Sequence, residues 1–381
     1  MSTIKCSVSV ALCSLGFAFL LLPQGQACGQ LNLGPEEIVQ ADGVDITVVG
    51  FSVPCFAYWD GDDLKDLIVG EGIGLEDGKV RVYLNDGTVD APHFTDFFFA
   101  QADGEDLVEP GYGCQGVFPR IVYWDADDRK DLLLGLADGT VKIFINIGTE
   151  DEPAFDAGTL LQVGPPGEKI DIDIAKRATS IAVDWNSDGR KDLAVGSIDG
   201  KIHIFINEGT DTEPDFLEET FAQENDEDLV VPTVRSSPVV MDLNGDGRKD
   251  LLSGNTEGQI LFYPNVGTDE APLFSGFEYV ESDGVIIDLE DTPRSRPFVT
   301  DWTGDGRLDL LIGAATGNVH LYQGVPLYGD VNDDGVVDID DIFAILAAWG
   351  PCDDPEDCPE DINGDGMVDI DDLFEVLANW S

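Results

Sequence analysis

Asp184-Trp185-Asn186-Ser187-Asp188-Gly189-Arg190-Lys191-Asp192-Leu193-Ala194-Val195-Gly196 is a polar loop followed directly by an apolar run. Side-chain oxygens stand at positions 1, 3, 5 and 9 of the loop, and a glycine stands at position 6. Oxygen ligands at alternating positions around a sharp glycine turn are how a short loop wraps a hard cation such as Ca²⁺. The stretch therefore predicts a cation-binding loop that leads into a core strand.

The same pattern occurs five times along the chain. The last loop aspartates are separated by 65, 61, 58 and 59 residues; they are Asp66, Asp131, Asp192, Asp250 and Asp309. After each of them come an apolar run, a tight turn and a segment of alternating apolar and polar residues. Such runs around a short turn predict a β-hairpin in each repeat.

A second signature, Asn-x-Gly-Thr-x-x-x-Pro-x-Phe, closes four of the repeats, at residues 85–94, 146–155, 207–216 and 265–274. Its phenylalanine is expected to open a further strand, for example over residues 94–101 or 216–223. Each unit of about 60 residues then holds four strands. Repeated four-stranded units predict a β-propeller, and no helical period interrupts residues 35–322.

The fifth repeat ends early, after His320-Leu321-Tyr322, and lacks the second signature. Residues 36–43 resemble residues 98–104 in register, so the N-terminal strand is expected to pair with the last blade. This closure would remove the unpaired edges of an open array. The predicted fold is all-β, a five-bladed β-propeller with N-terminal strand closure, over residues 28–326.

The composition changes after Pro326. Residues 330–349 and 361–380 are near copies, offset by 31 residues, and each joins a loop to apolar residues at helical spacing. The loops place oxygen ligands as an EF-hand does, with aspartate in place of the closing glutamate. The predicted Ca²⁺ ligands are Asp330, Asn332, Asp334, the Val336 carbonyl, Asp338 and Asp341, and then Asp361, Asn363, Asp365, the Met367 carbonyl, Asp369 and Asp372.

This loop–helix pair resembles a dockerin domain, in particular the cysteine-containing dockerin-like tails of exported planctomycete-type proteins. The resemblance implies a small α-helical, EF-hand-like domain over residues 327–381 that binds Ca²⁺ and attaches the chain to a cohesin-type or other cell-surface anchoring protein. The basic residues often found on a dockerin helix are absent, since Ala347-Ala348 and Ala378-Asn379 stand there. The identity of the anchoring partner stays open.

The propeller loops resemble FG-GAP/VCBS repeats, the Ca²⁺-loop blades of integrin-type propellers. The resemblance implies metal sites in the last three copies, in which the residue at position 7 is also part of the site. The site residues are Asp184, Asn186, Asp188, Arg190 and Asp192; Asp242, Asn244, Asp246, Arg248 and Asp250; and Asp301, Thr303, Asp305, Arg307 and Asp309. In the first two copies Tyr58 and Tyr123 replace the first ligand, and Asp63 and Asp128 replace the glycine. Metal binding there stays open, and the metal is expected to be structural.

The charge and the N-terminus indicate an exported protein. There are 76 acidic and 20 basic residues, a formal net charge of −56, which argues against nucleic-acid or anionic-lipid partners. Lys5, the apolar run over residues 6–22 and Gly25-Gln26-Ala27 predict a signal peptide over residues 1–27, with a membrane anchor or a lipoprotein signal as alternatives. No other segment approaches the ~20 apolar residues that span a bilayer, so the mature chain is expected to be secreted or held at the cell surface.

Export favours disulfides. Cys352 and Cys358 are close in sequence and are expected to pair, whereas Cys28, Cys55 and Cys114 leave one thiol over. A Cys55–Cys114 bridge is one pairing of these three.

The sequence favours a binding or scaffold protein over an enzyme. The three histidines lack metal-ligand spacing, and HExxH, GxSxG and P-loop motifs are absent. The alternative is a glycan-binding lectin or a polysaccharide-active enzyme on the propeller. That alternative depends on Trp59, Trp124, Trp185 and Trp302, which either form an exposed sugar-stacking ring or pack between blades.

Overall fold

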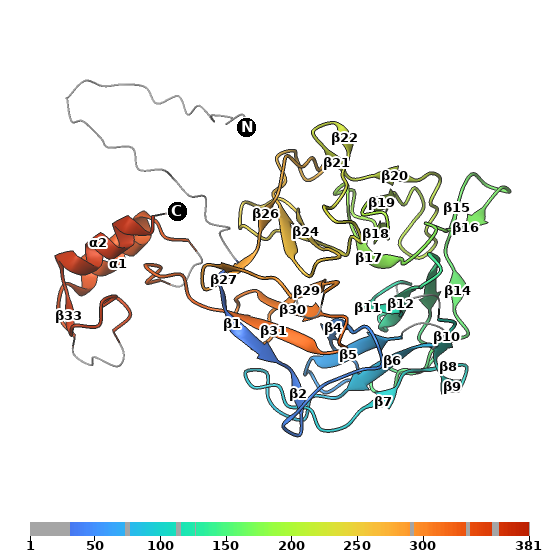
Figure 1. The fold of residues 1–381 in the computed structure, drawn as a ribbon, viewed down its shortest axis with the longest axis horizontal. Helices are drawn as coiled ribbons and strands as arrows, with labels where there is room; N and C mark the ends of the chain where they lie inside the picture. Colours follow the sequence, from blue (N-terminus) through green and yellow to red (C-terminus); the bar gives the residue numbers. More distant parts are fainter. Residues whose placement is uncertain are drawn as a thin grey trace.

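The computed structural model describes residues 31–72, 77–111, 116–125, 127–289, 293–332, 336–352 and 358–380. The predicted signal peptide, Cys28, Cys114 and the predicted ligand Asp334 lie outside the described residues. Five antiparallel sheets follow one another around a central axis in chain order, from blue to orange in Figure 1. The prediction of an all-β, five-bladed propeller is confirmed.

Each blade begins with its innermost strand and runs outward. Blade 1 comprises β4 (Val53–Ala57), β5 (Asp66–Glu71), β6 (Gly78–Tyr83) and β7 (Phe98–Phe99), with β10 (Val108–Glu109) also paired to β6. Blade 2 comprises β11 (Phe118–Val122), β12 (Asp131–Gly135), β13 (Val141–Phe144) and β14 (Thr159–Leu160). Blade 3 comprises β17 (Thr179–Val183), β18 (Asp192–Gly196), β19 (Ile202–Phe205) and β20 (Thr220–Phe221). Blade 4 comprises β23 (Pro238–Met241), β24 (Asp250–Gly254), β25 (Ile260–Tyr263) and β26 (Glu278–Tyr279).

The fourth strands are shorter than the sequence predicts. The signature phenylalanine does not open them: Phe94 forms isolated bridges with Asn85 and Ala41, and β7 begins only at Phe98. The reason is that this phenylalanine is buried beneath the turn, so its main chain bridges two blades instead of extending one.

Blade 5 is closed by the N-terminus, as predicted. It comprises β29 (Arg296–Thr300), β30 (Asp309–Gly313), β31 (Val319–Gly324) and then β1 (Leu33–Ile38), which is antiparallel to β31. A histidine–carboxylate contact shows the equivalence of β1 to an ordinary fourth strand. His320 contacts Glu36 in blade 5 just as His203 contacts Glu219 in blade 3.

Small hairpins link neighbouring blades. They are β2 (Gln40–Ala41) with β3 (Val44–Asp45), β8 (Gln101–Ala102) with β9 (Glu105–Asp106), β15 (Gln162–Val163) with β16 (Ile170–Asp171), β21 (Gln223–Glu224) with β22 (Glu227–Asp228), and β27 (Glu281–Ser282) with β28 (Val285–Ile286). The first four bridge to the buried phenylalanine of the next blade, and β27 pairs with β1. Every junction, including the one made by the N-terminus, therefore has main-chain pairing.

The core lies between the blades. One cluster joins Cys55, Trp59 and Ile68 of blade 1 to Leu132 and Phe155 of blade 2, and similar clusters fill the other junctions. Each sheet is thus covered on both faces by its neighbours. This explains why the second strand of every blade is buried at every residue and carries a run of consecutive, mostly apolar residues after its first aspartate instead of alternating.

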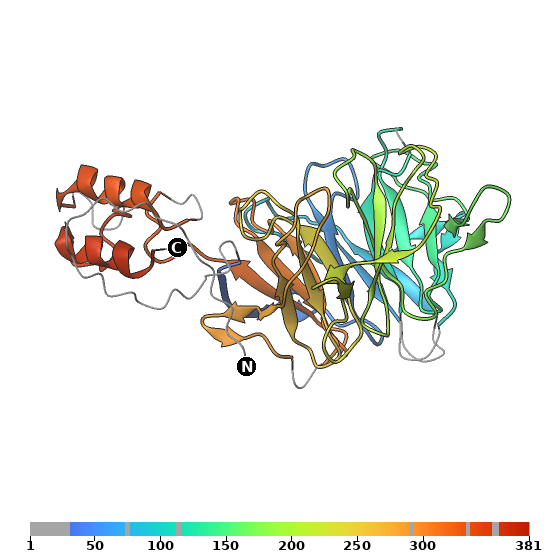
Figure 2. The same cartoon turned by 90° about the horizontal axis from the view of Figure 1, so that it is seen from above.

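The C-terminal segment forms a separate helical pair. α1 (Ile339–Ala348) and α2 (Ile370–Ala378) lie side by side outside the ring, and the short strands β32 (Gly350–Pro351) and β33 (Met367–Val368) pair with each other (Figure 2). Within the part of the chain that is described, neither helix is long and apolar enough to cross a bilayer.

The helical pair has a small core made of Val337, Ile345, Val368 and Val376. Each helix buries only part of the apolar face that its sequence predicts, because the small core covers only part of that face. The residues left exposed are Leu346, Trp349, Leu377 and Trp380.

One predicted disulfide is confirmed and another is wrong. Cys352 and Cys358 are bonded and lie between the two helices. Cys55 is a free, buried thiol between blades 1 and 2, so it does not pair with Cys114.

Candidate functional site

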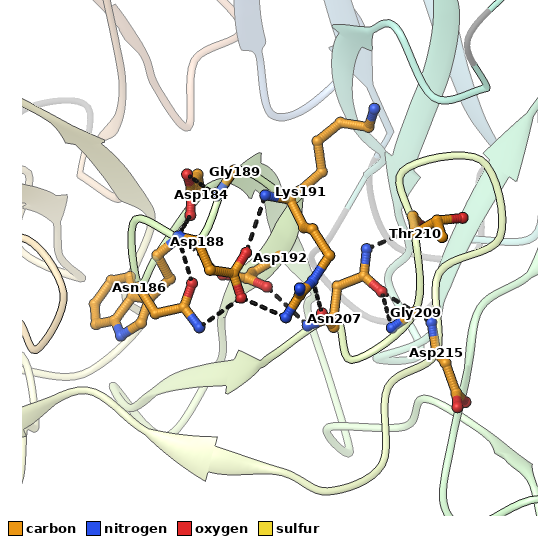
Figure 3. A network of polar contacts seen from close by, with 12 residues as sticks. Asp184, Asn186, Asp188, Gly189, Lys191, Asp192, Asn207, Gly209, Thr210 and Asp215 are labelled. Carbon is orange, nitrogen blue, oxygen red and sulfur yellow. Dashed lines mark hydrogen bonds and ion pairs between the residues drawn. The ribbon is translucent and has the colours of Figure 1, made fainter.

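The loop at residues 184–192 connects the innermost strand β17 to β18 and is folded into a tight turn (Figure 3). The Asp184 carboxylate accepts the N–H groups of Asp188 at 3.0 Å and Gly189 at 2.9 Å, and Asn186 accepts the Asp188 N–H at 3.2 Å. The positive φ of Gly189, 86°, allows the reversal. Three predicted ligand side chains are therefore gathered in one turn.

The same turn forms in three other loops. The first aspartate of each accepts the N–H of the position-6 glycine: Asp242 from Gly247 at 2.9 Å, Asp301 from Gly306 at 3.1 Å, and Asp361 from Gly366 at 2.7 Å. The last of these is in the helical pair and the others are in the ring. Similar spacing of aspartate, asparagine and glycine thus gives one turn geometry in two different surroundings.

The closing aspartate of each ring loop has a role that the sequence did not indicate. Asp192 accepts the Trp185 N–H at 2.9 Å and the Asn207 N–H at 2.7 Å, so both carboxylate oxygens hold main-chain donors. Equivalent pairs of donors bind Asp66, Asp131, Asp250 and Asp309. All five blades share this contact, including the two whose loops lack a first carboxylate.

Burial raises the pKa of these closing aspartates. It raises the pKa of Asp66 and of Asp250 to about 6, while the hydrogen bonds from the two main-chain N–H groups oppose the rise. The pKa of Asp192 is raised for the same reason.

The asparagine of the second signature is a further residue that was not predicted as functional. The Asn207 side-chain oxygen accepts the N–H groups of Gly209 at 2.9 Å and Asp215 at 3.0 Å, and the asparagine is buried. Asn85, Asn146 and Asn265 bind their own turns in the same way. The Asn-x-Gly spacing was the signal, since a side-chain oxygen two residues before an N–H forms an Asx turn.

Cationic side chains also tie the loops together. Arg190 binds the Asp188 carboxylate at 2.5 Å and donates from Nε to the Asn207 carbonyl at 2.6 Å. Arg248 repeats both contacts in blade 4, and Arg307 binds Asp305. Lysines at position 8 reach the preceding blade: Lys130 donates to the Asp60 carbonyl and Lys65 to the Asp301 carbonyl.

These contacts show how the oxygen atoms that could coordinate a cation are arranged. Asp184, Asn186 and Asp188 supply hard oxygen atoms from one turn, which fits the ligand chemistry of Ca²⁺. Asp192 faces main-chain N–H groups and Asp188 faces Arg190, so the carboxylates do not converge on one point. Among the described residues, no group of three or more His, Cys, Asp or Glu side chains is arranged to hold a metal ion.

The first two loops form the turn without the first carboxylate. Asp63 and Asp128 take the glycine position with φ of 64° and 62°, and Tyr58 and Tyr123 are exposed at position 1. Aspartate tolerates this left-handed conformation better than most residues.

In the helical pair, the closing aspartates organise each loop and complete the capping box of each helix. Asp372 is buried and accepts the N–H groups of Asn363 at 3.2 Å and Asp369 at 2.8 Å. Asp341 makes equivalent bonds to Val331 and Asp338. Asp338 and Asp369 are the N-caps of α1 and α2, each within a capping box.

The tryptophans at position 2 are buried, so of the two alternatives the packing between blades is confirmed and the exposed sugar-stacking ring is not formed. Trp59, Trp124, Trp185 and Trp302 are 4–8% exposed, and Trp59 contacts Phe155 of the next blade. Each ring fills the junction between two blades, because the first loop residue directs it inward from the end of the innermost strand. The aromatic basis for the lectin alternative is therefore absent.

A family model matches the region of the three complete loops. It describes the FG-GAP-like repeat and matches residues 184–253 and 242–312. Residues 184–312 carry FG-GAP-like repeats. The FG-GAP match includes all three ring loops that carry a first carboxylate. No curated protein matches the chain in sequence.

Solved structures resemble the ring only distantly. A Photorhabdus luminescens Tc holotoxin pore shares 12% identity and a TM-score of 0.37 over 76% of this chain, and the chain spans only 14% of that protein's length. BBS1N in complex with ARL6DN, in a lead-soaked crystal, shares 12% identity and a TM-score of 0.35, covering 76% of this chain and 96% of that one.

Proposed function

We propose that this chain is an exported, Ca²⁺-stabilised β-propeller that acts as a binding or scaffold module and is held in place by its dockerin-like tail. The observation that carries the proposal is the turn shared by the loops at Asp184, Asp242, Asp301 and Asp361. A ring with FG-GAP repeats supports the binding or scaffold role, and the shared turn supports a common cation.

Calcium would join oxygen atoms that the fold already brings into one turn. In blade 3 the ligands would come from Asp184, Asn186 and Asp188, with the Arg190 carbonyl following. Binding would compete with the Arg190–Asp188 ion pair and would neutralise carboxylates in a chain of net charge −56. Extracellular sites of this kind bind at about 10⁻⁴–10⁻³ M, so occupancy requires millimolar calcium. At ten times the Kd each site would add about 1.4 kcal/mol to stability.

The tail would provide the attachment. Its two units expose equivalent apolar side chains on α1 and α2, with Phe343 and Leu346 on one helix and Phe374 and Leu377 on the other. Exposed apolar groups on so small a unit favour contact with a partner protein. Ile339-Asp340 and Ile370-Asp371 are identical in the two copies, so either unit could face a cohesin-type or other anchoring partner.

Calcium titration of the metal-free protein tests the proposal. Calorimetry is expected to detect binding in both parts of the chain, and the melting temperature is expected to rise by a few degrees between 0.1 and 10 mM calcium, as mass action requires. Magnesium is expected to be weaker, because it demands a stricter octahedral arrangement. The proposal would be refuted if calorimetry detected no heat of calcium binding and the melting temperature did not change with calcium concentration.

Single substitutions assign the heat of binding to loops. Asp246→Asn is expected to remove the blade 4 site, and Asp365→Asn the site in the second tail unit. Asp62→Asn is the matched control, since it makes the same change in a blade 1 loop that lacks the first carboxylate. Equal losses from all three variants would contradict the assignment of the sites to loops with a first aspartate.

A further inference from the structure

Four arginines gather at one end of the central axis of the ring. Arg177 and Arg294 come two residues before an innermost strand, Arg235 comes three residues before one, and Arg296 is the first residue of β29. The innermost strands β4, β11, β17, β23 and β29 contact one another around the axis. The ring loops follow the opposite ends of these strands, so the arginines lie on the face away from the predicted calcium sites.

Two of these guanidinium groups are buried with unused hydrogen-bond donors. Arg177 and Arg296 have 0% exposure. Nη1 of Arg177 donates to the Ser236 carbonyl at 2.6 Å, and Nη1 of Arg296 donates to the Arg294 carbonyl at 2.8 Å. Within the described residues, Nε and Nη2 of both side chains have no hydrogen-bond partner.

The surroundings place these two groups near each other. The Arg177 and Arg296 guanidiniums lie 5.2 and 5.7 Å from the centre of the same Phe118 ring. Arg296 and Arg294 lie 4.7 and 5.0 Å from the centre of the Phe51 ring. The aromatic faces partly stabilise the positive charges, but they provide no hydrogen-bond acceptor for the N–H groups of the guanidiniums.

The arrangement is costly in the absence of a counter-ion. Burial and the charges of Arg235 and Arg294 lower the pKa of Arg177 to about 9, and the pKa of Arg296 is lowered by burial and by the other three arginines. Other arginines of this acidic chain bind carboxylates, as Arg81 binds Glu71 and Arg129 binds Asp127, whereas Arg120 donates to main-chain carbonyls. Buried charges are otherwise found paired and fully hydrogen-bonded.

We propose that a small oxyanion binds between Arg177 and Arg296, at this end of the central axis of the ring. In each guanidinium, Nε and Nη2 form one edge of the planar fork, and this edge matches two oxygens of one carboxylate, phosphate or sulfate group. Two such edges and the like charges of their neighbours select an anion with several oxygens over chloride.

The test is thermal unfolding of the full chain, dialysed free of oxyanions, at constant ionic strength. Phosphate, sulfate and acetate are titrated separately, with chloride as the reference salt. The melting temperature is expected to rise by a few degrees for each tenfold increase of the bound oxyanion above its Kd. Phosphate or sulfate acting alone assigns a tetrahedral anion, and acetate acting alone assigns a carboxylate. Identical melting curves in all four salts would overturn the proposal.

Variants connect the effect to the two arginines. Arg296→Met and Arg177→Met remove the free edges while keeping side-chain volume, and each is expected to weaken oxyanion affinity at least tenfold. Because each also relieves repulsion, the variants are expected to fold. Arg129→Met, in an exposed loop, is the matched control and keeps the response. Wild-type oxyanion affinity in both Arg177→Met and Arg296→Met would place the anion elsewhere and overturn the proposal. If a variant does not fold, the titration of the wild-type chain still tests oxyanion binding.

Discussion

At the scale of single residues, the closing aspartate of each ring loop combines two properties. Asp66 is fully buried and holds two main-chain N–H groups, one from its own loop and one from the end of the third strand. The carboxylate therefore fastens three segments of one blade at a single point. Sequence spacing marked the closing aspartates as special and predicted a metal ligand for those of the last three loops, but it left Asp66 open and did not indicate the main-chain donors, which leave no trace in a sequence pattern.

Replacing Asp66 by asparagine is expected to flatten the pH dependence of stability. The pKa of Asp66 in the folded chain is about 6, above its ordinary value near 4, so the folded state binds more protons between these values. The contribution of Asp66 is complete at low pH and is lost as pH rises through 6. Between pH 5 and pH 7 the loss is about 1 kcal/mol. The unfolding free energy of wild type minus that of Asp66→Asn, measured in urea, is expected to fall over this range.

A difference that stays constant from pH 5 to pH 7 would contradict a raised pKa at Asp66. Asp106→Asn is the control, because Asp106 is exposed on the hairpin formed by β8 and β9 and is not buried beneath a loop. Its difference from wild type is expected to lack a step near pH 6.

Asn207→Ala is expected to destabilise the ring by about 2–4 kcal/mol, because the N–H groups of Gly209 and Asp215 both lose their acceptor. Asn207→Asp keeps the accepting oxygen and is expected to restore much of the loss. Chemical denaturation of both variants measures the difference. Thr212→Ala, in the exposed part of the same turn, is the control and is expected to change stability by less than about 0.5 kcal/mol. An equal loss of stability in Thr212→Ala and Asn207→Ala would contradict the role of the asparagine.

At the scale of elements, the strand that completes blade 5 comes from the opposite end of the propeller sequence. β1 pairs with β31, and the buried Leu33 joins the core between blades 4 and 5. The missing signature after Tyr322 indicated that a four-stranded repeat with three strands needs a donor, and the resemblance of residues 36–43 to residues 98–104 identified that donor. What the sequence could not give is the short fourth strands, because the burial of Phe94 depends on the hairpin of the preceding blade.

Deleting residues 31–43 is expected to lower the melting temperature by roughly 10 °C or more and to promote association, because the edge of β31 becomes exposed. A synthetic peptide of the same sequence is expected to restore stability in a concentration-dependent manner. A peptide with Leu33 replaced by alanine is the control and is expected to bind more weakly. An unchanged melting temperature after the deletion would rule out a stabilising role for the closure.

At the scale of the whole molecule, repeat spacing predicted the number of blades and the position of the loops, because each copy buries its apolar strands only against its neighbours. The direction of the tryptophans and the arginine cluster were not predicted. A linear pattern leaves both an inward and an outward orientation open for Trp59 and its counterparts, although large aromatic side chains commonly fill gaps between elements. The arginines belong to three different repeats, and only the ring brings Arg177 to the same aromatic ring as Arg296.

Labelling of Cys55 is expected to report opening of the ring. Its thiol is buried between blades 1 and 2, and burial raises its pKa, with the charge of Arg120 opposing the rise. Reaction with a thiol reagent in the folded chain, followed by peptide mass spectrometry, is expected to be at least ~100-fold slower than in urea. The deletion of residues 31–43 is expected to accelerate it, whereas equal rates in folded and urea-unfolded chains would contradict a closed ring.

The pairing of β1 with β31 also bears on how the chain reaches its final shape. The strand that emerges first from the ribosome waits for a partner that is synthesised about 280 residues later. At typical rates of 5–20 residues per second, this leaves the growing chain without a completed ring for roughly 14 to 56 seconds. During that interval blade 5 does not yet exist and both ends of the array are open. The joint that closes the finished ring is therefore the last to form, and the ring cannot be complete before blade 5 has been synthesised.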